Sequence, residues 1–203
     1  MVISENANRP CSLEVLGTMS PGTSPAEVSF GGDLVLGSRT LIELGGTTKR
    51  SQYDELDVTG LASLGGTLDV LLIDGFPPAP GDTFEIITAA SILGTFVAES
   101  LPTLPGSLEW FVNYSGTSVE LISTFAGDFD FDGDVDGDDF LLWQLGGSPD
   151  PLSQSDLADW EANYDMGFGP LSGSSATVPE PATFMMLLIG MLALQIRRDV
   201  IVS

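Results

Sequence analysis

Residues 36–44 read LGSRTLIEL and residues 64–71 read LGGTLDVL, so a glycine turn followed by a short apolar strand pattern recurs after 28 residues. A repeat of this kind is typical of a coiled β-solenoid, in which successive turns of the chain bury a shared apolar interior. A β-sandwich with similar turns is the alternative. The repeat therefore predicts a mainly β protein.

The same pattern extends over residues 28–123. Short runs rich in Val, Ile, Leu, Thr and Phe alternate there with glycine turns, and helical periodicity is missing. We expect one β-rich domain at residues 25–124, preceded by an irregular N-terminal segment at residues 1–24. The predicted strands are Asp33–Leu36, Thr40–Leu44, Glu55–Val58, Thr67–Ile73, Thr83–Ile87, Leu108–Tyr114 and Ser118–Ile122.

Four short motifs occur in order within this domain: LGGT at 44–47, YDELDVTG at 53–60, LGGTL at 64–68 and GDTF at 81–84. Together they resemble autotransporter-type passenger repeats, the last turns of surface β-helices. The resemblance implies a structural stalk or display element that carries no catalytic residues.

Residues 128–139 read DFDFDGDVDGDD and fit a calcium loop. Ca²⁺ prefers about six to eight oxygen ligands, which such a loop supplies from alternate positions around a glycine at position six, here Gly133. We therefore expect one Ca²⁺. Its predicted ligands are the side chains of Asp128, Asp130, Asp132, Asp136 and Asp139 and the backbone carbonyl of Asp134. The alternative is a solvated acidic linker, since Asp and Gly favour turns.

Two short helical segments follow the loop, Phe140–Leu145 and Asp156–Tyr164. They align as two copies of one unit, although the second loop keeps only the closing Asp156 and the apolar Leu152. The sequence predicts that these helices enclose a small core rather than expose a recognition face. The expected core residues are Phe140, Trp143, Leu157 and Trp160.

The segment at residues 126–166 resembles a type I dockerin-like module, with an EF-hand-like first loop and a degenerate second one. In that family the module docks a cohesin-like receptor, so the resemblance implies such a partner. Loss of the second loop limits the expected number of calcium ions to one.

A Gly/Ser linker at residues 167–177 leads to the last segment, residues 178–198. Pro179-Glu180-Pro181 is followed there by the apolar run Phe184–Ile196 and by Arg197-Arg198. The run of 13 residues would span about 20 Å as a helix, less than the bilayer core of about 30 Å. It is therefore predicted to be a marginal transmembrane helix with its arginines in the cytoplasm.

The order of these three parts resembles the PEP-CTERM sorting signal. That resemblance implies recognition by an exosortase-like membrane protease. The protein would sit transiently in the cell membrane through its C-terminal helix and then reach the cell surface or the extracellular space.

Composition excludes several kinds of chemistry. The chain has 29 acidic and 6 basic residues, a net charge of -23 and no histidine. Because a phosphate backbone is bound by clustered cations, nucleic acid is excluded as a partner. The lack of histidine excludes Ser-His-Asp and Cys-His catalytic pairs, and the single Cys11 excludes an internal disulfide.

These observations predict an exported, non-catalytic surface or extracellular-matrix protein, stabilised by Ca²⁺ and sorted by an exosortase-type system. Extracellular polysaccharide and a cohesin-like receptor are further candidate partners. The alternatives are an accessory part of a dockerin-bearing polysaccharide-degrading enzyme, or a cohesin-binding module. No apolar run preceded by basic residues stands near Met1, so we expect an upstream start or a fragment of a larger gene product.

Overall fold

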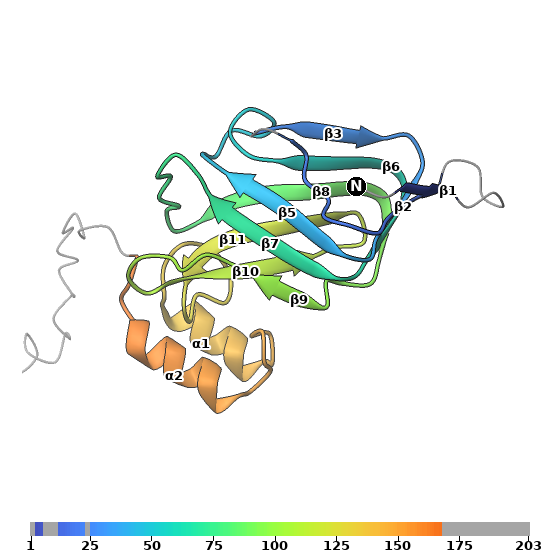
Figure 1. Cartoon of the computed structure of the whole chain (residues 1–203). Helices are drawn as coiled ribbons and strands as arrows, with labels where there is room; N and C mark the ends of the chain where they lie inside the picture. The colour runs from blue at the N-terminus through green and yellow to red at the C-terminus, as the bar shows by residue number, and fades with distance from the viewer. Residues whose placement is uncertain (1–2, 6–11, 23–24, 168–203) are drawn as a thin grey trace, which may run out of the picture. The chain divides into compact units, whose positions relative to one another are not determined.

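A computed structural model describes residues 3–5, 12–22 and 25–167 (Figure 1). Strands form the first part of the described chain, and two helices follow them. The elements are β1 (Ile3–Glu5), β2 (Ser12–Val15), β3 (Glu27–Phe30), β4 (Asp33–Leu36), β5 (Arg39–Leu44), β6 (Glu55–Leu64), β7 (Thr67–Leu72), β8 (Asp82–Leu93), β9 (Ala98–Ser100), β10 (Leu108–Tyr114), β11 (Ser118–Phe125), α1 (Gly137–Gln144) and α2 (Gln154–Asn163).

The seven predicted strands are all present, as β4 to β8, β10 and β11, and each begins within one residue of its predicted start. The sequence missed β1, β2, β3 and β9, which have three or four residues each. Two of these, β1 and β2, lie in the segment that the sequence predicts to be irregular. Such short strands depend on pairing with neighbours more than on their own pattern.

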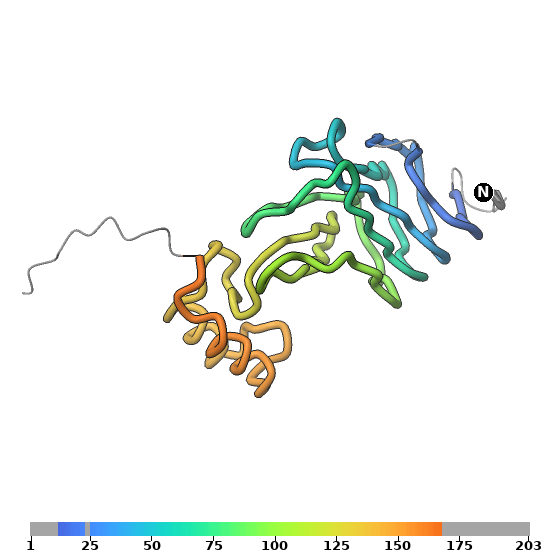
Figure 2. Tube along the Cα trace, turned by 60° about the vertical axis from the view of Figure 1, so that its left-hand side comes forward, coloured from blue at the N-terminus to red at the C-terminus, as the bar shows by residue number. Residues whose placement is uncertain are grey.

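The strands form two sheets. The larger sheet has the order β1-β2-β4-β6-β8-β11-β10, with β3 also paired to β6, and the smaller has the order β5-β7-β9. Pairing is parallel throughout the smaller sheet and among β2, β3, β4, β6 and β8. It is antiparallel between β1 and β2, β8 and β11, and β10 and β11. Figures 1 and 2 show the smaller sheet as a separate layer beside the larger one.

The predicted β-solenoid is wrong. The 28-residue offset does appear as parallel register, since Leu36 pairs with Leu64 and Arg39 with Thr67. After β8, however, the chain reverses into antiparallel β10 and β11, so the larger sheet is mixed and the coil does not continue. The alternative β-sandwich is also wrong, because sandwich sheets are antiparallel whereas β5-β7-β9 is entirely parallel.

One apolar core is shared by the two sheets. Parallel register places similar side chains beside one another, as with Ile42 and Val70 in the smaller sheet. In the larger sheet Leu34 pairs with Ala62, and both are fully buried. The core is therefore built from the repeat itself, with each strand stacking its apolar residues on those of the preceding one.

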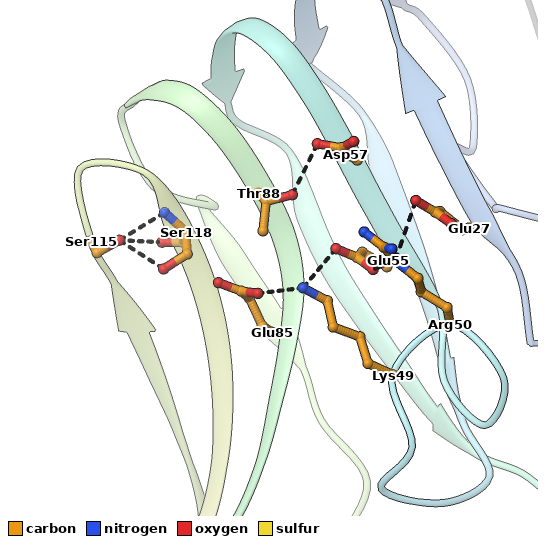
Figure 3. Close-up of polar contacts among 9 residues, drawn as sticks. All are labelled: Glu27, Lys49, Arg50, Glu55, Asp57, Glu85, Thr88, Ser115 and Ser118. Carbon is orange, nitrogen blue, oxygen red and sulfur yellow. Dashed lines mark hydrogen bonds and ion pairs between the residues drawn. The ribbon is translucent and has the colours of Figure 1, made fainter.

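Glu55 is fully buried although it lies on the face of β6 opposite to the core residue Leu56. Lys49 Nζ lies 2.8 Å from Glu55 Oε1 and also pairs with Glu85. Arg50 Nε lies 3.0 Å from Glu55 Oε2 and 3.3 Å from Glu27 Oε1 (Figure 3). These ion pairs hold the loop between β5 and β6 against the sheet.

No helix in the described part of the chain is long and apolar enough to cross a membrane. The helices α1 and α2 have only 8 and 10 residues. The described residues therefore do not contain the transmembrane helix that was part of the predicted fold. The segment for which that helix was predicted, residues 184–196, lies outside the described residues.

The turn before β7 requires glycine at position 66. Gly66 has φ +63, and a Cβ there would lie 1.8 Å from the carbonyl oxygen of Ser38, in the turn before β5. Gly75 has a similar φ of +72 but no atom within 4 Å of its Cβ position. Gly75 therefore provides a matched control for backbone strain alone.

We expect Gly66→Ala to lower the free energy of unfolding by about 1–3 kcal/mol more than Gly75→Ala, because only Gly66→Ala forces the two turns apart. Urea unfolding followed by circular dichroism measures both variants. Equal losses would show that the close approach of the turns is unimportant.

Candidate metal centre

The acidic loop follows β11 after Ala126 and Gly127 and ends in the first turn of α1. Gly133, predicted to make the sharp turn, has φ +98, and Phe131 has φ +62. Asp130 Oδ1 accepts a hydrogen bond from Asp132 N at 3.2 Å, and Asp132 Oδ1 accepts one from Asp134 N at 3.1 Å. These side-chain-to-backbone bonds fold the loop on itself without sheet or helix pairing.

Three of the predicted ligands lie together. Asp128, Asp130 and Asp139 each offer a carboxylate oxygen within 4.8 Å of the others. Asp128 and Asp139 are buried, whereas Asp130 is exposed. The side chains of Asp132, Asp134 and Asp136 do not belong to this group, which is the only one of its kind among the described residues.

Asp139 joins both ends of the loop. Its Oδ1 accepts hydrogen bonds from Phe129 N at 2.6 Å and Asp130 N at 3.2 Å, and its Oδ2 accepts one from Asp136 N at 2.7 Å. The Asp136 side chain in turn accepts hydrogen bonds from Asp138 N at 2.7 Å and from the backbone of Asp139. The reciprocal bonds between Asp136 and Asp139 form a capping box at the start of α1. The sequence predicts Asp139 as a ligand but does not reveal this structural role.

Asp128 has one engaged and one free oxygen. Its Oδ2 accepts hydrogen bonds from the Thr124 hydroxyl and, at 3.2 Å, from Gly133 N. Its Oδ1 is buried and has no hydrogen-bond partner among the described residues, as is also true of Asp134 Oδ1. Because unpaired buried carboxylate oxygens are costly, both fit a bound hard cation.

The pKa values of four carboxyl groups in the loop are raised, mainly by desolvation. Partial desolvation is the largest cause for Asp130, with contributions from the charges of Asp139, Asp132 and Asp128, and the pKa rises to about 6. Desolvation is also the largest cause for Asp128, Asp134 and Asp139, whose pKa values are raised as well. For these four carboxyl groups, the folded loop therefore favours the protonated form more than the unfolded chain does.

Contacts from distant parts of the chain hold the loop in place. Phe131 packs on Phe111 of β10, with ring centroids 4.6 Å apart. Trp160 Nε1 donates to the carbonyl of Asp136 at 2.6 Å. Val135 exchanges backbone hydrogen bonds with the segment after α2, donating to Met166 at 2.9 Å and accepting from Asp165 at 3.0 Å. No pattern in the sequence indicates these pairings, which join residues far apart in the chain.

Three of the four expected core residues are in ring contact, although all four are only partly buried. Ring centroids of Phe140 and Trp160 lie 4.8 Å apart, and those of Phe140 and Trp143 lie 5.7 Å apart. In the second loop, Asp156 Oδ2 accepts a hydrogen bond from Asp150 N at 3.0 Å. That loop is thus closed by a side chain, in keeping with its predicted loss of ligands.

Comparison with protein families identifies one segment. Residues 177–198 match the family described as PEP-CTERM protein-sorting motif. The match confirms the resemblance of the tail and indicates an exported protein sorted by an exosortase, a membrane protease. The comparison with curated proteins found no match. The dockerin-like, EF-hand-like and autotransporter-type resemblances receive no support from these comparisons.

The predicted sorting residues all lie within the matched segment and outside the residues that the structure describes. They are Pro179, Glu180, Pro181, Arg197 and Arg198.

The raised pKa values predict an unusual pH dependence in the absence of metal. A carboxyl whose pKa is higher in the folded than in the unfolded chain binds its proton more tightly when folded, so protonation favours folding. For Asp130 the window runs from its ordinary value of 3.8 to about 6. Stability is therefore fully present below this window and is lost as pH rises through it.

In a chelator, we expect a higher Tm at pH 5 than at pH 7.5, measured by circular dichroism. Asp130→Asn should reduce the difference, because it removes the group with the pKa of about 6. A Tm that falls between pH 7.5 and pH 5 would contradict the prediction.

Proposed function

We propose that this chain is an exported, non-catalytic surface or extracellular-matrix protein whose folded part is stabilised by one Ca²⁺ in the loop at residues 128–139. The buried, unpartnered Oδ1 of Asp128, in a carboxylate that lies with those of Asp130 and Asp139, carries the calcium proposal. The matched sorting motif carries the exported part.

The donor set favours Ca²⁺ over other metals. All candidate ligands are oxygens, and the chain has no histidine and only one cysteine for softer metals. Asp128, Asp130 and Asp139 would hold the ion, with Asp132, Asp134 and Asp136 as further ligands from the same loop. Many carboxylates on a glycine-containing loop suit the larger, more variable coordination shell of Ca²⁺ better than the strict octahedron of Mg²⁺. The bound ion would supply the positive charge that the crowded aspartates lack.

The ion pairs and hydrogen bonds of buried carboxylates in the sheets support a structural role. Glu55 is enclosed by Lys49 and Arg50. The buried Asp54 accepts hydrogen bonds from Ala26 N at 2.8 Å and Glu43 N at 3.0 Å. These carboxylates stabilise loops and strand ends. We therefore infer that the β-rich region has a display or supporting role rather than a catalytic one.

The proposal extends to the fate of the tail. The apolar run at residues 184–196 would hold the chain at the membrane for a time, with Arg197 and Arg198 on the cytoplasmic side. Cleavage near Pro179-Glu180-Pro181 would then release the protein to the cell surface or beyond. No described contact favours a polysaccharide or a cohesin-like receptor, and neither is part of the proposal.

Isothermal titration with CaCl₂ tests the metal site. We expect one site per chain and no comparable heat with MgCl₂. The double variant Asp128→Ala/Asp132→Ala should abolish binding, because it removes the first and third side-chain ligands. Asp138→Ala is the matched control, since Asp138 is an exposed aspartate of the same segment that is not a predicted ligand. A stoichiometry near two, or binding that survives the double variant, would refute the assignment.

Mass spectrometry of the mature protein from its native host tests the sorting proposal. We expect a C-terminus near residues 179–181, because the proline-flanked Glu180 offers an extended stretch to a protease. Glu180→Ala should impair processing, whereas Ser174→Ala in the preceding linker should not. Mature protein whose peptides run through Arg198 would show that the tail is retained.

A further inference from the structure

We infer that Thr124, which lies outside the acidic loop, is a positioning residue that presets Asp128 for the cation, so that the end of β11 forms part of the metal site. The inference rests on the proposed calcium function and adds to it a residue that the loop pattern does not contain. It also joins the larger sheet to the ion through a single hydrogen bond.

The contact itself is buried. Thr124 and Asp128 are each only 2% exposed, and the threonine hydroxyl donates to Asp128 Oδ2. Gly133 N donates to the same oxygen at 3.2 Å, whereas Oδ1 has no partner among the described residues. With Oδ2 held by two donors, the carboxylate is fixed in one orientation. Such outer-shell bonds determine how a ligand is presented to a metal.

The backbone around Thr124 makes this contact possible. Asp128 N donates to the carbonyl of Phe125 at 3.0 Å, which turns the chain back over the end of β11. Ala126 N donates to the carbonyl of Ser107 at 3.1 Å and ties the same turn to the start of β10. The first residue of the loop is therefore placed by the pairing of β10 with β11.

A second contact attaches the middle of the loop to β10. The ring of Phe131 packs on that of Phe111 in β10, and Phe131 adopts the left-handed conformation with φ +62. The loop is thus attached to the sheet near its beginning and near its centre. An ion that selects the present loop conformation would also select the present end of β11, because coupling between two such elements is reciprocal.

The neighbouring residue provides a matched comparison. Ser123 is fully buried like Thr124, but its hydroxyl has no hydrogen-bond partner among the described residues. Burial at this strand end therefore does not by itself provide a hydroxyl with a hydrogen-bond partner. The bond from Thr124 to Asp128 is specific to the residue next to the loop.

Calcium titration of the full chain tests the inference with three variants. Thr124→Val keeps the shape of the side chain but removes the donor, and we expect the Kd to rise about tenfold or more. Thr124→Ser keeps the hydroxyl and should bind close to the wild type. Ser123→Ala removes the neighbouring hydroxyl and should leave the Kd unchanged. Circular dichroism in chelator confirms that each variant is folded.

Hydrogen exchange of the wild type provides a test that does not depend on the folding of a variant. Added Ca²⁺ should slow exchange at the end of β11, residues 123–126, as well as in the loop. Protection confined to residues 128–139 would overturn the inference, as would equal Kd values for the wild type and a folded Thr124→Val. In both cases the calcium function itself would stand. A wild type that binds no Ca²⁺ would overturn the proposed function together with the inference.

Discussion

Parallel register is the constraint on which the rest of the structure depends. Strands β6 and β7 lie 28 residues after the strands with which they first pair, and this spacing stacks Ile42 on Val70 and Leu34 on Ala62. A slip of one residue would turn every side chain of the strand to the opposite face. The same register also places Glu27 beside Glu55, where like charges oppose each other. The loop before β6 relieves that repulsion with Lys49 and Arg50, two of the three described cations.

The register also determines where the acidic loop can be built. Parallel stacking extends from β2 to β8, after which the chain returns antiparallel as β10 and β11. Because β11 pairs with both β8 and β10, its end is fixed relative to the sheet. The loop starts at that end, and its first carboxylate is held by Thr124. The site is thus shaped by strand pairing as much as by its own sequence.

Local patterns in the sequence predicted the main strands, both helices and the sharp turn at Gly133, because these depend on neighbouring residues. The offset of 28 residues was also visible. The overall fold was not, because the next step of the parallel pairing is longer: Thr67 pairs with Ala98, 31 residues on, and the chain then reverses. In the candidate site, too, local features could be predicted from the sequence whereas tertiary contacts could not. Loop spacing brought together Asp128, Asp130 and Asp139. The contacts from Trp160 and Met166, however, arise only when distant segments meet, and the contact from Thr124 depends on the turn after β11.

The raised pKa values of the loop carboxylates are consistent with export of the chain to a place where divalent ions are abundant. Asp139 closes the loop through three backbone donors, so the chain's own hydrogen bonds help to stabilise this turn. Closure nevertheless confines several carboxylates whose pKa values are raised, mainly by desolvation. A loop with this charge gains most from a divalent ion where such ions are abundant, and calcium modules of extracellular proteins bind at about 10⁻⁴ to 10⁻³ M. The sorting motif directs the chain to export. Under the proposed function, the loop would therefore be folded but electrostatically strained before export, and the ion bound outside would remove that strain.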